Sequence, residues 1–316
     1  MVALAAVAAI AAGTGYALTA TDRGPAQTIT GRGTRPGTAT RAGHATQQAT
    51  LAAKVLHVAA ARLAREAATA EPAPGQWIYY TEVDESGANS HPSSEGPEWV
   101  TFDGDQSAYY EVGGPFVVHT SSTSFPPPGT NPWVALNTYG IHPQTAWNAL
   151  AALPADPHAL LAVIAHQVAT PAGEQFAAAS VTTFGGPRQP TREQLEFDYL
   201  TRILWNAYLG APPAALAAVY RAMATLPGIS VQPGIKDTAG GQAIGVSDDD
   251  GYDQLLIDPV SDQVIGIRQL STGIGPVTAA QAKEGKERQS DYPAKGTLIY
   301  EMVYARTAEV PAPGDR

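Results

Sequence analysis

The chain has 316 residues, a formal net charge of −10 at pH 7 and no cysteine, which excludes disulfides, thiol catalysis, cysteine-rich zinc sites and lipoprotein acylation. Residues 1–70 carry seven Lys/Arg and two Asp/Glu, whereas the rest carries 12 Lys/Arg and 27 Asp/Glu. An acidic globule repels phosphate backbones, so we expect no nucleic-acid partner.

The first twenty residues, MVALAAVAAIAAGTGYALTA, contain no charged side chain. Their length suits a membrane crossing, which needs about 20 apolar residues. We therefore predict a transmembrane anchor or signal segment over residues 1–20, with a buried alanine helix as a further alternative. The arginines that follow this segment conflict with the positive-inside rule, so we expect a basic cytoplasmic portion to precede it in a longer protein.

Residues 21–45 are rich in Thr, Gly and Arg, with almost no bulky apolar side chain. Such a sequence buries too little surface to offset its ordering entropy, and it predicts a flexible linker. A single folded domain is predicted over residues 46–310, and residues 311–316 are predicted to be a disordered tail.

Apolar residues at helical spacing predict an alanine-rich helix over residues 49–68, which the sequence EPAPG ends. The sequence QWIYYTEV then predicts a strand with Trp77 and Tyr79 on one side and Ile78 and Tyr80 on the other. EWVTFDGDQSAYYEV resembles two strands joined at an Asp-Gly turn, and PFVVHTS adds another strand.

A helical block follows. Asp156 is predicted to cap a helix that begins with Pro157. Thr191 and Gln194 have the spacing of a capping box at the start of a second helix. A third helix is predicted to open at Pro213 and to end at the sequence LPG.

The C-terminal part predicts an antiparallel meander with short connections. A strand block, a helical block and a second strand block indicate an α+β fold rather than alternating βαβ units. We predict one curved antiparallel sheet, an incomplete β-barrel, wrapped around a few helices.

Residues 246–270, VSDDDGYDQLLIDPVSDQVIGIRQL, contain the densest group of acids in the chain. A calcium loop of EF-hand type with Gly251 at its sixth position would have Val246 and Ile257 at the two anchoring positions, so it lacks both ligands. The acids are therefore predicted to lie in turns between strands.

Three carboxylate pairs are candidates for acid/base chemistry. They are Asp103 with Asp105, Asp253 with Asp258, and Glu98 with Glu111. Nothing in the sequence buries these pairs, and turn acids are the simpler interpretation. The seven histidines show no zinc-binding spacing, and neither G-x-S-x-G nor S-x-x-K occurs. We therefore predict no catalytic residue, no metal site and no cofactor.

The aromatic residues are the better candidates for a site. If a half-open sheet leaves a cavity under the helices, some of them would line it and accept an acyl chain or a peptide. The alternative is that they are ordinary core residues. The predicted ligand-binding residues are Trp77, Tyr79, Tyr109, Trp133 and Trp147.

The ordered motifs PGQWIYY, EWVTFDG, LPADPHALLAVI, APPAALAAVYRAMATLPGI and LLIDPVSDQVIGIRQL cover roughly residues 46–305. In order and spacing the chain resembles a family of uncharacterised actinobacterial membrane-anchored proteins, often encoded beside extracytoplasmic-function sigma factors. The resemblance implies the incomplete β-barrel of lipoprotein carriers and of a periplasmic regulator that binds an anti-sigma factor. It implies no catalytic residue, and a shared fold alone does not fix function.

These features predict a non-enzymatic domain on the extracytoplasmic side of the cell membrane, tethered by a single pass through residues 1–20. The predicted partner is a lipid or acyl ligand, or a membrane regulatory protein, with a role in a sigma-factor or envelope pathway. The alternatives are a carrier of lipid or lipoprotein, and a hydrolase with an unrecognised carboxylate pair.

Overall fold

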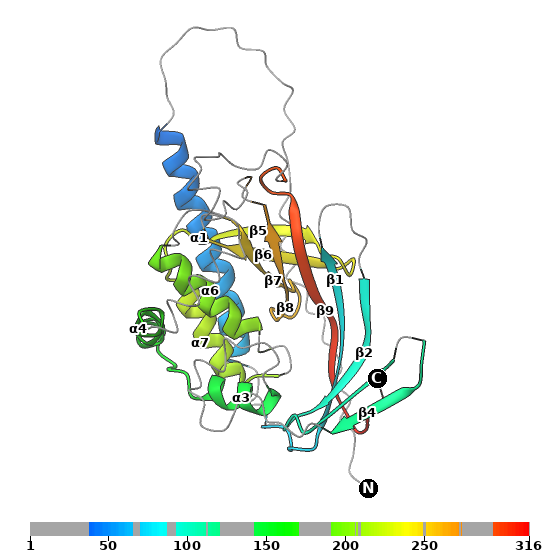
Figure 1. Cartoon of the computed structure of the whole chain (residues 1–316). Coiled ribbons are helices and arrows are strands. Elements are labelled where there is room, and N and C mark those ends of the chain that lie inside the picture. Colours follow the sequence, from blue (N-terminus) through cyan, green and yellow to red (C-terminus); the bar gives the residue numbers. More distant parts are fainter. Residues whose placement is uncertain are drawn as a thin grey trace, which may run out of the picture.

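The structure, a computed structural model, describes residues 38–65, 70–86, 93–111, 113–120, 142–170, 191–205, 207, 210–248, 251–271, 273 and 293–315. These residues form an α+β fold with five helices and one open, antiparallel sheet of nine strands (Figure 1). The predicted fold class and the antiparallel sheet are therefore confirmed. The predicted membrane segment, residues 1–20, lies outside the described residues.

The sheet has the strand order β4-β3-β2-β1-β9-β8-β7-β6-β5. Two meanders, one from each end of the domain, are joined because β9 pairs with β1 on one side and with β8 on the other. The strands are β1 (Trp77–Ser86), β2 (Ser93–Thr101), β3 (Gln106–Tyr110), β4 (Phe116–Thr120), β5 (Ser230–Lys236), β6 (Gln242–Ser247), β7 (Asp253–Ile257), β8 (Val264–Leu270) and β9 (Leu298–Val310).

The turns predicted from Asp-Gly sequences are present. The amide of Gly104 donates to the carbonyl of Thr101 over 2.8 Å between β2 and β3, and Gly104 has a φ of +77°. The amide of Gly251, with a φ of +66°, donates to Oδ1 of Asp248 over 3.1 Å between β6 and β7. Positive φ angles favour glycine at both turns.

The Asp258 side chain organises the next turn, between β7 and β8. Its Oδ1 accepts from the amide of Val260 over 2.6 Å and from that of Ser261 over 3.0 Å. Aspartate favours turns through such bonds to its own backbone. These contacts confirm turns within residues 246–270.

Among the described residues the helices are α1 (Thr38–Leu63), α3 (Pro143–Ala151), α4 (Pro157–Val168), α6 (Arg192–Trp205) and α7 (Pro213–Met223). Helix α1 begins within the segment for which the sequence predicts a linker. The sequence reasoning did not predict α3, which is short and has no side-chain cap.

The predicted helix starts are confirmed by their hydrogen bonds. Oδ1 of Asp156 accepts from the amide of Ala159 over 2.8 Å at the start of α4. At the start of α6 the amide of Thr191 donates to Oε1 of Gln194 over 2.8 Å, and the amide of Gln194 donates to Oγ1 of Thr191 over 3.3 Å. These reciprocal bonds form a capping box.

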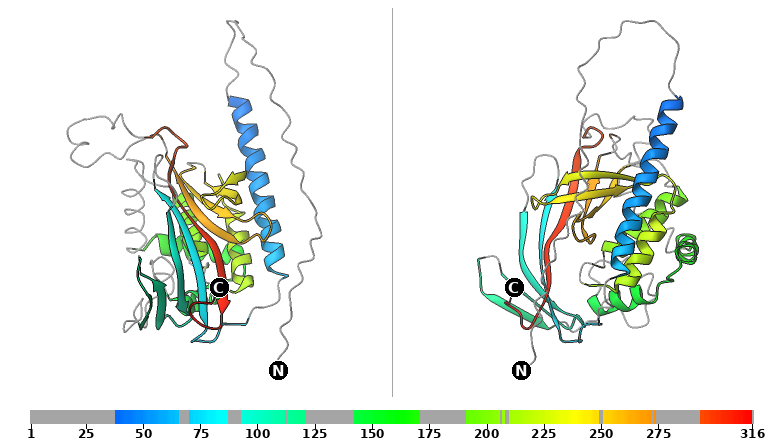
Figure 2. Two further views of the ribbon diagram at one scale, coloured as in Figure 1. Left: turned by 90° about the vertical axis from the view of Figure 1, so that its right-hand side faces the viewer. Right: turned by 180° about the vertical axis from the view of Figure 1, so that it is seen from behind.

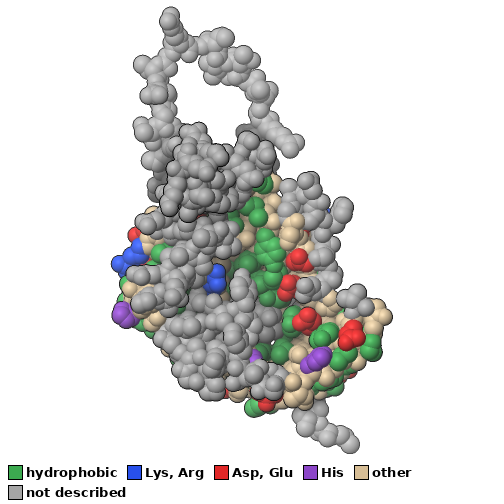
Figure 3. Space-filling model, in the orientation of Figure 1, with side chains coloured by type: hydrophobic (Ala, Val, Ile, Leu, Met, Phe, Trp, Pro, Cys, Tyr) green, Lys and Arg blue, Asp and Glu red, His purple; other side chains and the backbone are tan. Residues whose placement is uncertain are grey.

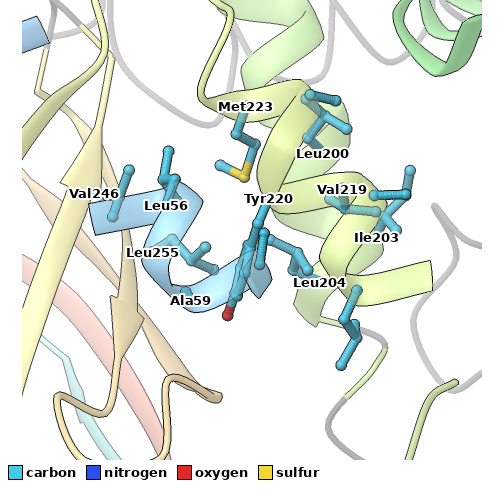
Figure 4. Close-up of a cluster of buried hydrophobic side chains, with 14 of the residues drawn as sticks. Leu56, Ala59, Leu200, Ile203, Leu204, Val219, Tyr220, Met223, Val246 and Leu255 are labelled. Atoms are coloured by element: carbon cyan, nitrogen blue, oxygen red, sulfur yellow. The ribbon is translucent and has the colours of Figure 1, made fainter. Parts of the chain in front are cut away.

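The main core lies between the helices and one face of β5–β8 (Figure 4). Leu56 of α1, Leu200 of α6 and Met223 of α7 meet there, each fully buried, with Val246 and Leu255 from the sheet. Each fully buried side chain of this size contributes about 1.5–3 kcal/mol. Figure 1 shows the helices gathered beside this half of the sheet, while β2 and β4 extend away from them.

The opposite face of the sheet is covered in part by the β5–β6 hairpin. A register shift between Gln232 and Ile235 bends β5, and the hairpin crosses the strands β8 and β9 (Figure 2). Ile235 packs there against Leu256 and Val303. The guanidinium of Arg268 pairs with Glu301, a carboxylate that is fully buried.

The C-terminal residues also pack against the sheet. The indole N–H of Trp99 donates to the backbone oxygen of Asp315 over 2.7 Å, and Nε2 of Gln76 donates to that of Val310 over 2.6 Å. Residues 311–315, which belong to the predicted disordered tail of residues 311–316, are among the described residues. A buried indole N–H needs an acceptor, and the tail supplies it.

Candidate ligand-binding site

The predicted site residues do not lie in one place. Trp77 and Tyr79 lie side by side on one face of β1, and both are buried against Trp99, with Val310 next to them. The Tyr79 and Trp99 rings lie 5.3 Å apart between centroids. This face of β1 is the one turned away from the helix α3.

Trp147 lies on the other face of the sheet. It comes from α3, and its ring contacts that of Phe102 edge-on, with centroids 6.0 Å apart. Ile78 belongs to the same cluster, with Tyr80 packed against it. Alternation along β1 therefore separates Trp77 and Tyr79 from Trp147, and the three cannot line a single cavity.

Tyr109 is a surface residue, 37% exposed, on β3. Its ring stacks on that of His119 with centroids 5.2 Å apart, and its hydroxyl lies 3.0 Å from Nε2 of His119. Trp133 lies outside the described residues.

The structure adds residues that the sequence reasoning did not select. Trp205, at the end of α6, contacts Tyr304 of β9 with centroids 4.7 Å apart, and Tyr304 contacts Tyr80 with centroids 6.3 Å apart. Tyr80 also packs against the cluster of Phe102 and Trp147. We call these five side chains the helix-facing aromatic group. The alternation of β1 indicated Tyr80, but no local pattern indicated that Trp205 and Tyr304 meet.

Acidic residues border this group. The hydroxyl of Tyr80 donates to the carboxylate of Glu98, its partner across the β1–β2 ladder. Further along β1, Glu82 lies opposite Tyr304, and Asp84 lies opposite Met302. All three acids are partly buried. Figure 3 shows Asp and Glu side chains next to a patch of hydrophobic side chains on the face of the molecule that Figure 1 presents.

A second cluster of polar residues surrounds Asp253, at the start of β7. Burial raises the pKa of Asp253 to about 7. The hydrogen bond from Nε2 of Gln269, at 3.0 Å, lowers this pKa in part. The negative charge of Asp248 raises it further, and the positive charge of Arg202 of α6 lowers it. Burial also raises the pKa of the nearby Tyr199 to about 12, and Arg202 again opposes the shift. Shifted carboxyl groups are common at functional sites but also occur in structural networks.

None of the three carboxylate pairs considered from the sequence forms an evident catalytic pair. Asp103 accepts from the amide of Asp105 over 3.2 Å in an exposed turn. Asp253 and Asp258 lie at opposite ends of β7, about 17 Å apart along the strand. Glu98 is bonded to Tyr80, as described above, while Glu111 is exposed and follows β3. The acid that influences Asp253 is instead Asp248.

Within the described residues, no group of three or more His, Asp or Glu side chains is placed to hold a metal ion. No helix in that part of the chain is long and apolar enough to cross a membrane. Neither a family model nor a curated protein sequence matches the chain.

Proposed function

We propose that the chain is a membrane-tethered, extracytoplasmic domain that binds an apolar ligand, a lipid acyl chain, against the helix-facing aromatic group. The observation that supports this is the continuity of the group. It runs from Phe102 and Trp147 through Tyr80 to Tyr304 and Trp205, between the sheet and helices from two parts of the chain. Sites for apolar ligands are lined mostly by aromatic and other hydrophobic side chains.

The bordering acids favour a particular kind of headgroup. Glu82 and Glu98 lie opposite Tyr304 and Tyr80, Asp84 lies two residues beyond Glu82 on β1, and the part of the chain after residue 70 is strongly acidic. Anionic headgroups would be repelled there, whereas neutral or cationic ones would be accepted. A carrier of lipid or lipoprotein would use the same surface, and the resemblance to actinobacterial sigma-factor-associated proteins suggests a regulatory role instead.

Fluorescence quenching by a zwitterionic phospholipid with a brominated acyl chain tests this proposal, because bromine quenches only tryptophans that it contacts. Quenching is expected in the full chain. It should be strongly reduced when Trp147 and Trp205 are both replaced by Phe. In the matched control, Trp77 and Trp99 are replaced by Phe. These two residues lie on the opposite face, so this variant should still be quenched. Quenching that survives the first pair but not the second would contradict the proposal.

The native ligand requires a separate measurement. Mass spectrometry of the chain purified without detergent from its membrane fraction should detect a bound lipid. A chain that carries a peptide instead would favour the protein-ligand interpretation and count against the acyl chain.

A hydrolase is the second candidate function. The observation in its favour is the raised pKa of Asp253 beside Asp248, since a carboxyl group with a pKa near 7 suits general acid or base work. Hydrolysis of ester or glycoside substrates that is lost in Asp253→Asn, with the fold intact, would support it. Activity unchanged in that variant would exclude Asp253 as the catalytic group.

A further inference from the structure

The two edges of the sheet differ in how they are protected against further strand pairing. Strand β5 forms one edge; it contains Pro233, its pairing with β6 is interrupted by a register shift, and helix α1 packs against it. Proline, irregular pairing and a covering helix are the usual means of blocking an edge. Strand β4 forms the other edge and pairs with β3 over five residues without interruption.

Among the described residues, strand β4 has none of these protections. Its sequence, FVVHT, contains no proline and no Asp, Glu, Lys or Arg. In the described part of the chain, β3 is its only neighbour in the sheet. An edge strand of this kind presents backbone N–H and C=O groups to any extended segment that lies beside it.

Exposed apolar side chains gather at the same edge. The described residues include five large hydrophobic side chains that are exposed, and three of them, Tyr109, Tyr110 and Val118, lie on β3 and β4. Tyr110 lies with Phe116 on one face of the hairpin, and Tyr109 stacks on His119 on the other. A strand added to β4 would therefore find apolar contacts on both faces.

Charge selects the kind of segment that fits. The exposed acids Asp105 and Glu111 lie immediately before and after β3, about 20 Å apart along the strand. A second copy of the chain paired antiparallel through β4 would place these like charges three strand spacings, or about 14 Å, apart. A strand with basic residues at its ends would instead place opposite charges two strand spacings, or about 10 Å, from the acids, across β4.

We propose that β4 is a docking edge for an extended segment of a partner protein, with an apolar, β-branched centre and a basic residue at each end. The main-chain ladder would supply binding strength, and the acids at both ends would supply selectivity. This surface is separate from the helix-facing aromatic group, so the proposal stands or falls independently of the proposed function.

Peptide binding to the full chain tests the proposal. The probes are a fluorescein-labelled peptide of alternating threonine and valine with an arginine at each end, and the same peptide with a glutamate at each end. Fluorescence anisotropy should show the arginine-ended peptide to bind about tenfold more tightly, with a difference that shrinks as salt is added. Equal affinity for both, or binding of neither, would overturn the proposal.

Variants of the acids locate the contact. Replacing Asp105 and Glu111 together by Lys should reverse the preference between the two peptides. The matched control replaces Glu193 and Glu309, two exposed acids on α6 and β9, and should leave the preference unchanged because the net charge changes equally. A control that reverses the preference as well would show that only overall charge matters, and would overturn the proposal.

Strand addition also has a backbone signature. An extended peptide directs its N–H groups to alternate sides, so N-methylation of one alternating set should abolish binding while methylation of the other set leaves it unchanged. Equal effects of the two N-methylated sets on binding would contradict pairing of the peptide with β4 as an added strand. Sedimentation velocity completes the test: a dimer that dissociates in Val118→Lys would show that a second copy occupies β4, and would overturn the choice of partner.

Discussion

The backbone amide of Thr238 donates to Oε1 of Glu301 over 2.7 Å and so joins the β5–β6 turn to β9, 63 residues further along the chain. Glu301 is wholly shielded from solvent, and its other oxygen accepts from Arg268 of β8. Arg268 in turn donates to the carbonyl of Lys236 over 2.9 Å. One buried carboxylate thus holds two strands, β8 and β9, and the β5–β6 hairpin in a fixed arrangement.

Removing Arg268 should destabilise the fold strongly. Arg268→Met leaves Glu301 buried without its counter-charge, and we expect a loss of about 3–5 kcal/mol in the free energy of unfolding, measured by urea denaturation. The double variant with Glu301→Gln keeps an acceptor for Thr238 and should lose less. Arg192→Met is the comparison, because the arginine of its i,i+4 pair with Glu196, at 2.8 Å, is 67% exposed whereas Glu196 is 9% exposed. Since Arg192 stays hydrated, its loss should cost less, about 1 kcal/mol. Equal losses at both sites would contradict this account.

Asp253 should make stability depend on pH. Its pKa is raised from 3.8 to about 7, so the folded chain binds more protons than the unfolded chain between those values. Its contribution to the free energy of unfolding therefore falls as pH rises through that window. At 1.36 kcal/mol per pH unit the loss is at most about 4 kcal/mol, since the side chain keeps a partly exposed surface.

Asp253→Asn isolates this effect because it keeps an oxygen for Gln269. At about pH 4 the urea midpoints of parent and variant should be equal. At about pH 8 the variant should have the higher midpoint. The exposed Asp105→Asn should show no such difference. A variant that is less stable than its parent at the higher pH would refute the assignment.

Gly104 should tolerate alanine poorly. Its φ is +77°, and a Cβ there would lie 2.3 Å from Cγ of His142, so the ring must move. We expect a loss of about 2–3 kcal/mol, from backbone strain and the clash together. Gly113, with a φ of +67° and no atom within 4 Å of its added Cβ, is the matched control and should lose about 1 kcal/mol. Thermal unfolding of both variants measures the difference, and similar losses would argue against the clash.

Thr191→Ala should cost about 1 kcal/mol by removing one side of the capping box at the start of α6. Thr191→Ser retains the hydroxyl and should be nearly neutral. Denaturation by urea with circular dichroism detection separates the two variants. A loss of similar size in both would show that the methyl group of Thr191, rather than its hydroxyl, matters.

The features that were predictable from the sequence are those set by a few neighbouring residues. Asp156 and the pair Thr191 and Gln194 mark helix starts because their bonds close within one turn. Asp248 and Asp258 lie in turns for the same reason, whereas Asp253, which was also predicted to lie in a turn, begins β7. Helix α3 was missed because its nine residues show little beyond Pro143 to mark them.

The candidate site was only partly predictable because sheet topology decides which aromatic residues meet. Trp77 and Trp147 are equally aromatic in the sequence, but the pleat of β1 and the position of α3 place them on opposite faces. Trp205 and Tyr304 meet only because α6 packs over β8, next to β9. The sequence likewise does not distinguish Asp253 from the other acids near it, because the environment of its carboxyl group depends on residues from β8 and α6.

The position of β9 has a consequence for synthesis of the chain. Gln76 and Val310 are joined by a hydrogen bond although they are 234 residues apart, because β9, which is synthesised after the other eight described strands, fills the middle of the sheet. Until then, β1 and β8 each present an open edge, and pairing of such distant strands is slow. The nascent chain therefore passes through a state with two half-sheets, in which a chaperone or the wrong strand competes with β9.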